Sequence, residues 1–383
     1  MGSIKVYFDN AATTPMRNEV IELMTQSMTT TFGNPSSTHG FGRSAKSIIE
    51  TARKSIAKHL NCEPREITFT SGGTESDNMI LRCAVKDLNV KTIVSSVLEH
   101  HAVLHPLDEL QKEGINIRYV DLDEDGSPKL DQLKSILEAD DTPKLVSLMH
   151  INNEIGNLLD LDRVGALCKA KCAYFHTDAV QGVGHFKFDL KSQPIDFLSS
   201  SAHKFHGPKG VGFTFIRKNT TIDPFIVGGP QERGQRAGTE SVHNIIGLQK
   251  AIEMAYDNLE EESAYILSLK KYFITHLKRL FPTAYFNGLS EDLKKSSYTL
   301  VNVALPLEDS KSKLLDFHLD LKGIACSKGS ACQAGAGLGS HVLGNLKRSE
   351  AIKKLPSLRF SFSSFNTFEE IDYVIECLSE LKN

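Results

Sequence analysis

The stretch "EITFTSGGTESDN" (residues 66–78) indicates the fold, because it combines a strand, a glycine turn and the start of a helix. Residues 66–71 form a short run of the kind expected for a buried strand. Gly72 and Gly73 follow, and a helix is predicted from about Thr74. A helix N-terminus after such a turn offers free N–H groups that often bind phosphate. Because glycine turns are also common as purely structural features, this interpretation needs support from the rest of the chain.

Further apolar runs of similar length continue the pattern along the chain. They are bounded by turn residues and alternate with helical segments such as 44–60, as expected for strands buried on both faces. The predicted strands are 66–71, 91–97, 116–122, 144–150, 173–178, 196–202 and 210–216. This order predicts an α/β fold whose large domain has a mostly parallel, seven-stranded sheet with helices on both faces.

The pattern changes after a long helical stretch at 243–281. Strand-like runs at 298–305 and 358–362 and a helix-like segment at 368–382 indicate a smaller α+β domain. We therefore expect two domains: a large domain at 15–255, and a small domain formed by 1–14 and 256–383. A cysteine-bearing mobile loop is predicted at about 326–343 in the small domain.

Composition excludes several classes of protein. The 383 residues carry a formal net charge of −3, which favours neither direct nucleic-acid binding nor an anionic membrane surface. No run of about 18 apolar residues and no secretory signal is present, so we expect no membrane span and a cytoplasmic location. The seven cysteines are scattered, which fits a reducing compartment. Cys168 and Cys172 lie on a predicted helix without a second ligand pair, so we expect buried thiols and no metal site.

Polar residues follow several of the predicted strands, at the edge where open α/β sheets bind ligands. Each has an ordinary interpretation, as a hydrogen-bonded loop residue, a helix cap or a solvated turn residue. Their coincidence at one edge is more informative. These residues are His100, Asn153, Asp178, Gln181, Ser201, His203, Lys204 and Lys209. A phosphate cradle, a carboxylate, a histidine and a lysine in one crevice point to pyridoxal phosphate.

The stretch "GSACQAGAG" (329–337) places Cys332 among glycines, which disfavour a stable helix or strand. It is either a surface loop with an incidental cysteine or the carrier of a nucleophile that must travel. The residues alone do not decide between these two interpretations.

Ten short motifs occur in an order that is familiar from one family. They are "YFDNAATTP" (7–15), "FGNPSSTHGFG" (32–42), "GGTESDN" (72–78), "EHHAVL" (99–104), "NNEIG" (152–156), "TDAVQGVG" (177–184), "SAHKFHGPKGVG" (201–212), "ERGQRAGT" (232–239), "GSAC" (329–332) and "LRFSF" (358–362). From about residue 6 to 377 the chain resembles the cysteine desulfurases of the NifS/IscS type. These are fold type I pyridoxal-phosphate enzymes related to class-V aminotransferases.

The resemblance implies a role for each motif residue. Lys204 binds the cofactor aldehyde covalently, His100 stacks on the ring and relays protons, and Cys332 accepts the sulfur as a persulfide. The implied cofactor-binding residues are Gly73, Thr74, His100, Asn153, Asp178, Gln181, Ser201, His203, Lys204 and, from a second subunit, Thr239. Asn153 and Arg359 bind the carboxylate of the substrate, L-cysteine.

The resemblance also implies partners and leaves alternatives. It predicts a homodimer that passes sulfur to a protein acceptor, either an iron–sulfur scaffold or a tRNA-thiolation protein. "QAGAGLGS" after Cys332 departs from the usual family pattern, which leaves the acceptor's identity open. A selenocysteine lyase or a related pyridoxal-phosphate enzyme would share the fold. A non-catalytic interaction protein would be expected to have lost Lys204, Asp178 or Cys332, and all three are present.

Overall fold

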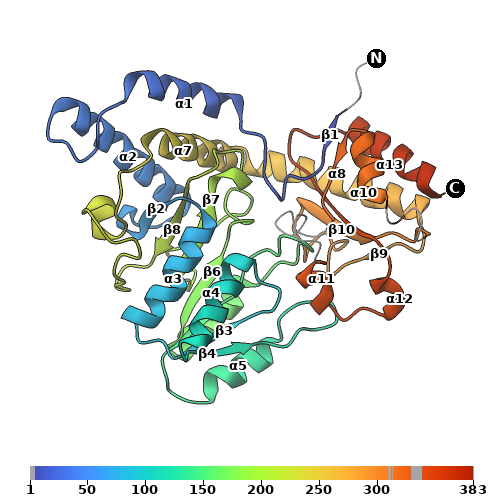
Figure 1. Cartoon of the computed structure of the whole chain (residues 1–383), viewed down its shortest axis with the longest axis horizontal. Coiled ribbons are helices and arrows are strands. Elements are labelled where there is room, and N and C mark those ends of the chain that lie inside the picture. The colour runs from blue at the N-terminus through green and yellow to red at the C-terminus, as the bar shows by residue number, and fades with distance from the viewer. Residues whose placement is uncertain (1–4, 309–311, 313, 329–338, 383) are drawn as a thin grey trace.

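The computed structural model describes residues 5–308, 312, 314–328 and 339–382. Figure 1 shows a large α/β unit beside a smaller unit formed mainly by the last third of the chain, with the N-terminal strand crossing to the smaller one. The predicted α/β fold class is confirmed. The domain limits at 14/15 and 255/256 stay a prediction.

The large sheet has seven strands in the order β2-β8-β7-β6-β5-β3-β4. β8 runs opposite to the other strands of this sheet, which are parallel to one another, and this confirms the predicted, mostly parallel arrangement. The strands are β2 (Ile67–Thr70), β3 (Thr92–Ser95), β4 (Asn116–Tyr119), β5 (Lys144–Ser147), β6 (Tyr174–Asp178), β7 (Phe197–Ser201) and β8 (Gly212–Ile216). Five of them are buried along their whole length, and β4 lies exposed at the edge.

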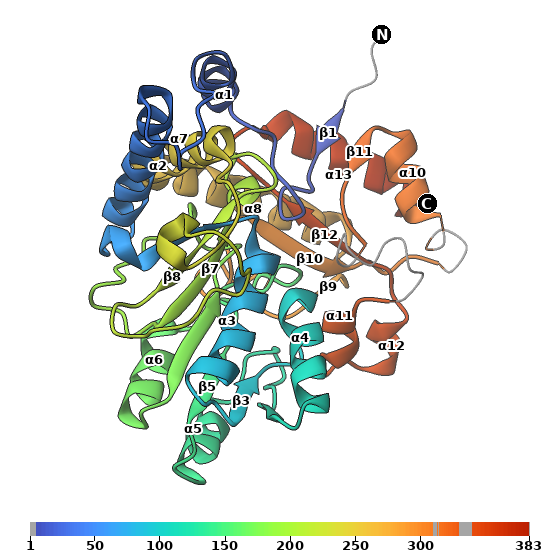
Figure 2. The same cartoon turned by 60° about the vertical axis from the view of Figure 1, so that its left-hand side comes forward.

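Helices cover both faces of this sheet because its strands point apolar side chains both ways. One core cluster joins the sheet to α1 (Asn18–Thr30), α2 (Gly40–His59), α5 (Leu130–Glu138), α6 (Leu161–Ala170) and α7 (Val242–Asp257). A second cluster joins the opposite face to α3 (Gly73–Asp87) and α4 (His101–Lys112). Figure 2 shows α3 and α4 in front of the sheet, where their N-termini meet the carboxyl ends of the parallel strands.

The smaller unit contains a three-stranded antiparallel sheet in the order β12-β10-β9. Its strands are β9 (Tyr285–Phe286), β10 (Leu300–Ala304) and β12 (Ser357–Ser361). A separate core cluster packs this sheet against α8 (Leu259–Leu280) and α13 (Phe368–Lys382). The other α-helices in the described part of the chain are α10 (Leu315–Leu321), α11 (His341–Asn345) and α12 (Glu350–Lys353).

The N-terminal strand belongs to this smaller unit although it lies far from it in sequence. β1 (Val6–Tyr7) pairs in parallel with β11 (Ile324–Ala325), and Phe8 is fully buried in the small core. The chain then runs from Asp9, which bridges to Ser361, toward the large sheet. This crossing places residues 9–14 between the two units, beside the carboxyl ends of the strands of the large sheet.

Two expectations about cysteines need correction. Cys172 does not lie on the helix with Cys168, because α6 ends at Ala170 and Cys172 adopts a left-handed backbone conformation with φ of 51°. Cys168 is buried as expected, but Cys172 is exposed. Within the described ranges, no group of three metal-binding side chains comes together and no helix is long and apolar enough to cross a membrane.

Candidate active site

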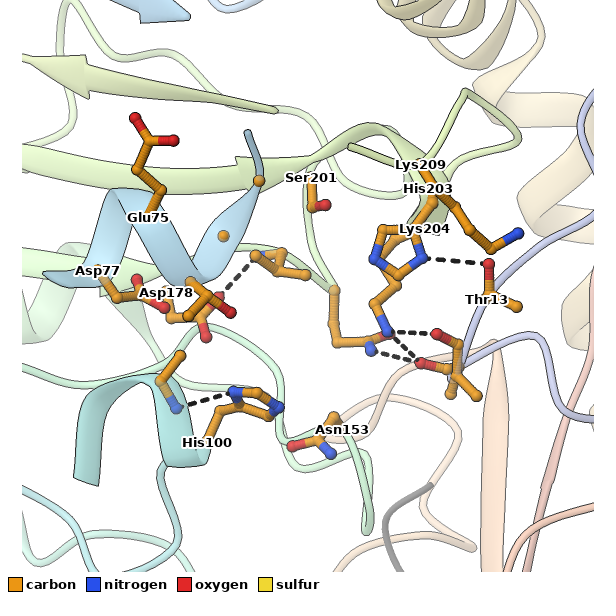
Figure 3. A pocket seen from close by; sticks show the side chains of 18 of the residues that line it. Thr13, Glu75, Asp77, His100, Asn153, Asp178, Ser201, His203, Lys204 and Lys209 are labelled. Atoms are coloured by element: carbon orange, nitrogen blue, oxygen red, sulfur yellow. Dashed lines mark hydrogen bonds between the residues drawn. The ribbon is translucent and has the colours of Figure 1, made fainter. Parts of the chain in front are cut away.

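A cavity of about 440 Å³ opens at the carboxyl ends of the parallel strands (Figure 3). It lies where the glycine turn after β2, the N-terminus of α4 and the loops after β5, β6 and β7 converge, as expected for an open α/β sheet. Most of the predicted site residues line it. They are Gly73, Thr74, His100, Asn153, Asp178, Gln181, Ser201, His203, Lys204 and Arg359.

Lys204 lies directly after β7, at the end of a short 3-10 turn formed by Ala202–Lys204. Its Nζ donates hydrogen bonds to the carbonyl oxygens of Ala11 (2.7 Å) and Ala12 (2.8 Å). Those carbonyls come from the segment that crosses between the two units. Backbone acceptors therefore help to hold the amine inside the cavity.

Asp178 ends β6, and its Oδ1 accepts a hydrogen bond from the Val180 N–H at 2.9 Å. Burial, with a smaller contribution from the nearby Asp77 carboxyl, raises the pKa of Asp178 to about 7, and Val180, His176 and Lys204 oppose the rise. A buried carboxyl with a raised pKa ionises more readily when a cation lies beside it. Gln181 follows, and its Nε2 donates to the Ala11 carbonyl at 2.9 Å.

The glycine turn between β2 and α3 is shaped for close approach. Gly72 has φ of +146°, and a Cβ added at Gly73 would meet Val180 Cγ2 at 2.5 Å. The N-terminus of α3 can therefore approach the loop after β6, with Thr74 and Ser201 on the cavity wall. Such a terminus presents backbone N–H groups to an anion.

His203 and His100 are both neutral at pH 7. Burial, assisted by nearby Lys204, lowers the pKa of each to about 4. His203 Nδ1 is 3.1 Å from Thr13 Oγ1. His100 is the N-cap of α4, and its Nδ1 accepts the Ala102 N–H at 3.1 Å. With Nδ1 as the acceptor, the neutral His100 ring carries its proton on Nε2.

Arg359 approaches the cavity from β12 in the smaller unit and is 1% exposed. Its Nη1 donates to the Asn153 carbonyl at 2.7 Å, and its Nη2 donates to Asp9 Oδ1 at 2.8 Å and to Ser327 Oγ at 3.1 Å. Its Nε has no hydrogen-bond partner within the described residues. The structure thus joins Arg359 and Asn153, which are predicted to bind one substrate carboxylate.

Two predicted residues are not placed in this cavity. Thr239 is exposed and does not line it, whereas the sequence assigned it to the site of a second subunit. Cys332 lies outside the described residues, as does the part of the predicted mobile loop at 329–338.

Other residues line the cavity without having been assigned a role from sequence. They include Ala11, Ala12, Thr13, Glu75, Asp77 and Met149. All of these six except Met149 lie inside quoted motifs, so the motifs marked the segments but not which atoms face the cavity. Ala11 and Ala12 act through their carbonyls, which no side-chain pattern reveals. Lys209, for which a solvated turn was an ordinary interpretation, is exposed and also lines the rim.

The residues present fit pyridoxal phosphate. The cavity volume suits a small cofactor with an amino-acid substrate. Its donor set offers a lysine amine for an aldehyde, a buried carboxyl for a pyridine nitrogen, and a glycine-edged helix terminus for a phosphate.

Comparison with known proteins agrees with this chemistry. The family model for aminotransferase class-V matches residues 6–374. The chain is 42% identical to the cysteine desulfurase IscS of Dictyoglomus turgidum, over 98% of this chain and 94% of that protein. It is 43% identical to the IscS of Methanosarcina thermophila, over 98% and 91%. A solved NifS-like protein superposes with a TM-score of 0.90 at 36% identity, covering 99% of each chain. The chain therefore belongs to the class-V aminotransferase family and, within it, to the cysteine desulfurases of the NifS/IscS type.

Proposed function

We propose that this chain is a pyridoxal-phosphate-dependent L-cysteine desulfurase, which converts L-cysteine to L-alanine and leaves the sulfur on Cys332 as a persulfide. The observation that carries the proposal is the convergence of the Lys204 amine, the Asp178 carboxyl and the Arg359 guanidinium on one cavity. These groups match an aldehyde, a pyridine nitrogen and an amino-acid carboxylate respectively.

The cofactor side of the cavity would be held by residues of the large sheet. When bound, pyridoxal phosphate supplies an electron sink for bond cleavage in the amino acid. Lys204 would hold the aldehyde carbon through Nζ, Asp178 would keep the pyridine nitrogen protonated, and Gln181 would bind the ring hydroxyl. Gly73, Thr74, Ser201 and His203 hold the phosphate.

The substrate side would be held by residues of both units. Arg359 and Asn153 bind the carboxylate of L-cysteine, because a guanidinium pairs with a carboxylate through two parallel hydrogen bonds. His100 covers the ring face and, as a neutral imidazole, exchanges a proton at Nε2. Lys204 Nζ is the second group that carries a proton near the substrate.

The sulfur transfer balances without an added oxidant. The thiolate of Cys332 attacks the sulfur of the substrate, so an S–S bond forms while the C–S bond breaks. The electron pair of the broken bond stays with the carbon fragment, which takes up a proton and becomes the methyl group of alanine. The role of Cys332 rests on the "GSAC" motif at 329–332.

Partners are part of the same proposal. Exposed Thr239, away from the cavity of its own chain, supports a homodimer in which it completes the phosphate site of the other copy. The persulfide would pass to a protein acceptor, an iron–sulfur scaffold or a tRNA-thiolation protein. All six described cysteines are free thiols, which supports a reducing, cytoplasmic location.

The test is turnover by the purified, cofactor-loaded protein in the presence of a thiol reductant. L-Cysteine should yield alanine and sulfide in equal amounts. Parallel reactions with L-selenocysteine distinguish a cysteine desulfurase from a selenocysteine lyase. A selenocysteine lyase would release selenide from L-selenocysteine while leaving L-cysteine almost unchanged. Absence of alanine from both substrates would reject the proposed reaction.

A further inference from the structure

A second buried carboxyl, Asp77, lies at the same cavity and has no part in the function proposed above. It sits on α3, one turn after the glycine turn, and is 1% exposed. Asp77 lines the cavity together with Asp178, and Figure 3 shows both on the side that α3 contributes. At this position Asp77 is either a neutral acid or a second carboxylate anion beside Asp178.

The surroundings of Asp77 do not suit a carboxylate anion. Neither of its oxygens has a hydrogen-bond partner of ordinary geometry within the described residues. Asp178, in contrast, accepts the Val180 N–H at 2.9 Å. The Ser199 hydroxyl favours the charged form, but a buried anion with few donors still bears much of the cost of lost hydration. A neutral acid needs only one acceptor for its proton.

His176 on β6 can provide that acceptor. It is fully buried, its Nδ1 is 2.9 Å from Ser147 Oγ, and its Nε2 is 3.2 Å from Ser199 Oγ and 3.4 Å from Asp77 Oδ1. Burial lowers the pKa of His176 to about 4, so the ring is neutral at pH 7. When Nδ1–H donates to Ser147, Nε2 is left as an acceptor that faces the acid proton of Asp77.

The other titratable groups around Asp77 add to this preference. Two further buried acids lie nearby: Asp178 on β6 and Glu99 after β3, whose Oε2 also has no described partner. Lys204, the cation after β7, lowers the pKa of Asp178 and so favours the anion at that residue. Burial raises the pKa of Asp77 to about 7, and the nearby Ser199 hydroxyl offsets part of the rise. Closely spaced buried carboxyls do not all ionise together.

We propose that Asp77 is held in its protonated form and acts as a positioning residue, which leaves Asp178 as the single anion at the position of the pyridine nitrogen. The neutrality of Asp77 stands on the contacts above, whereas its role toward Asp178 rests on the proposed function. If Asp77 ionised as well, the carboxylates of Asp77 and Asp178 would compete for the one proton on the pyridine nitrogen.

The test is thermal unfolding of Asp77→Asn and wild-type protein from pH 5 to pH 8, without and with cofactor. In the unfolded chain Asp77 ionises near its ordinary pKa of about 3.9. The folded state keeps the proton to higher pH, so wild-type stability should fall as pH rises between the two pKa values. Asparagine has no such proton to lose. The Tm of the variant relative to wild type should therefore increase by a few degrees between pH 5 and pH 7 and then level off.

Asp108→Asn is the matched control, because Asp108 is exposed on α4, and its Tm difference should stay constant with pH. A Tm difference for Asp77→Asn that is constant, or that shrinks as pH rises, would contradict a protonated Asp77.

A second measurement covers the case in which Asp77→Asn does not fold. The infrared spectrum of cofactor-loaded wild-type protein at pH 6, with and without ¹³C-labelled aspartate, should contain a carbonyl band of a protonated aspartic acid. Its absence would overturn the inference. Failure of the proposed function would look different. The wild-type protein would make no alanine, but the Tm difference between Asp77→Asn and wild type would still increase between pH 5 and pH 7.

Discussion

The two sides of the cavity are built in different ways. The cofactor side is formed by three short stretches, 70–78, 178–181 and 201–204, each at the end of a strand in one sheet. The substrate side is formed around Arg359 by Asp9, Asn153 and Ser327, which come from separate parts of the chain. The first side follows from local sequence, whereas the second exists only when the two units meet. We therefore expect substitutions on the cofactor side to remove chemistry, and those on the substrate side to weaken binding.

The largest effect is expected for Lys204→Ala. Without the amine, the aldehyde has no covalent partner and no proton carrier at that position. Turnover of L-cysteine should be abolished and the visible absorbance of the bound cofactor should change, while the circular dichroism of the fold is retained. Lys187→Ala, an exposed lysine paired with Glu260, is the control and should keep wild-type turnover. Sulfide release that persists in Lys204→Ala would exclude Lys204 from the reaction.

Asp178→Asn should have the next largest effect. The amide cannot supply the negative charge that holds a proton at the pyridine nitrogen, so kcat should fall by roughly 100-fold or more. The cofactor should remain bound through the glycine turn and Ser201. We would measure kcat at saturating L-cysteine on samples matched for cofactor content. A kcat within a few-fold of wild type would remove Asp178 from the cofactor side.

Arg359→Lys tests the substrate side. A lysine keeps the charge but loses the planar fork and the bonds to Asp9 and Ser327, so kcat/KM should fall by about 10- to 100-fold, mostly through KM. Arg65→Lys, at an exposed arginine, is the control. A loss that appears in kcat with KM unchanged would mean that Arg359 acts on chemistry, and the contrast between the two sides would not hold.

The smallest effect is expected for Asp9→Asn. Arg359 keeps its bonds to Ser327 and to the Asn153 carbonyl, so its orientation should be only partly relaxed. KM for L-cysteine should change by a few-fold with kcat retained. If Asp9→Asn were more damaging than Arg359→Lys, Asp9 would have a role beyond orienting the guanidinium.

Much of the fold was predictable because it depends on local pattern. The seven predicted strands of the large sheet all occur, with ends that shift by at most three residues. Helix 368–382 was predicted with its observed ends. Cys172 was misplaced because the end of α6 depends on a left-handed turn that the apolar pattern does not reveal.

The candidate site was predictable to the level of residue identity. Lys204, Asp178 and Gln181 follow strands, so their meeting at one edge could be inferred from the order of the elements. The Ala11 and Ala12 carbonyls that hold Lys204 could not, because they enter the cavity only when β1 pairs with β11. The charge state proposed for Asp77 was equally hidden, since it depends on which groups surround its oxygens in the folded chain.

The most direct test of the account is the mass of the peptide that contains Cys332 after brief exposure of the cofactor-loaded enzyme to L-cysteine, without reductant. We predict one added sulfur atom on that peptide, formed together with one equivalent of alanine. The added mass should be absent in Cys332→Ser, because a hydroxyl is a far poorer nucleophile toward sulfur than a thiolate. Added sulfur confined to the Cys326 peptide, or full sulfide release by Cys332→Ser, would contradict it.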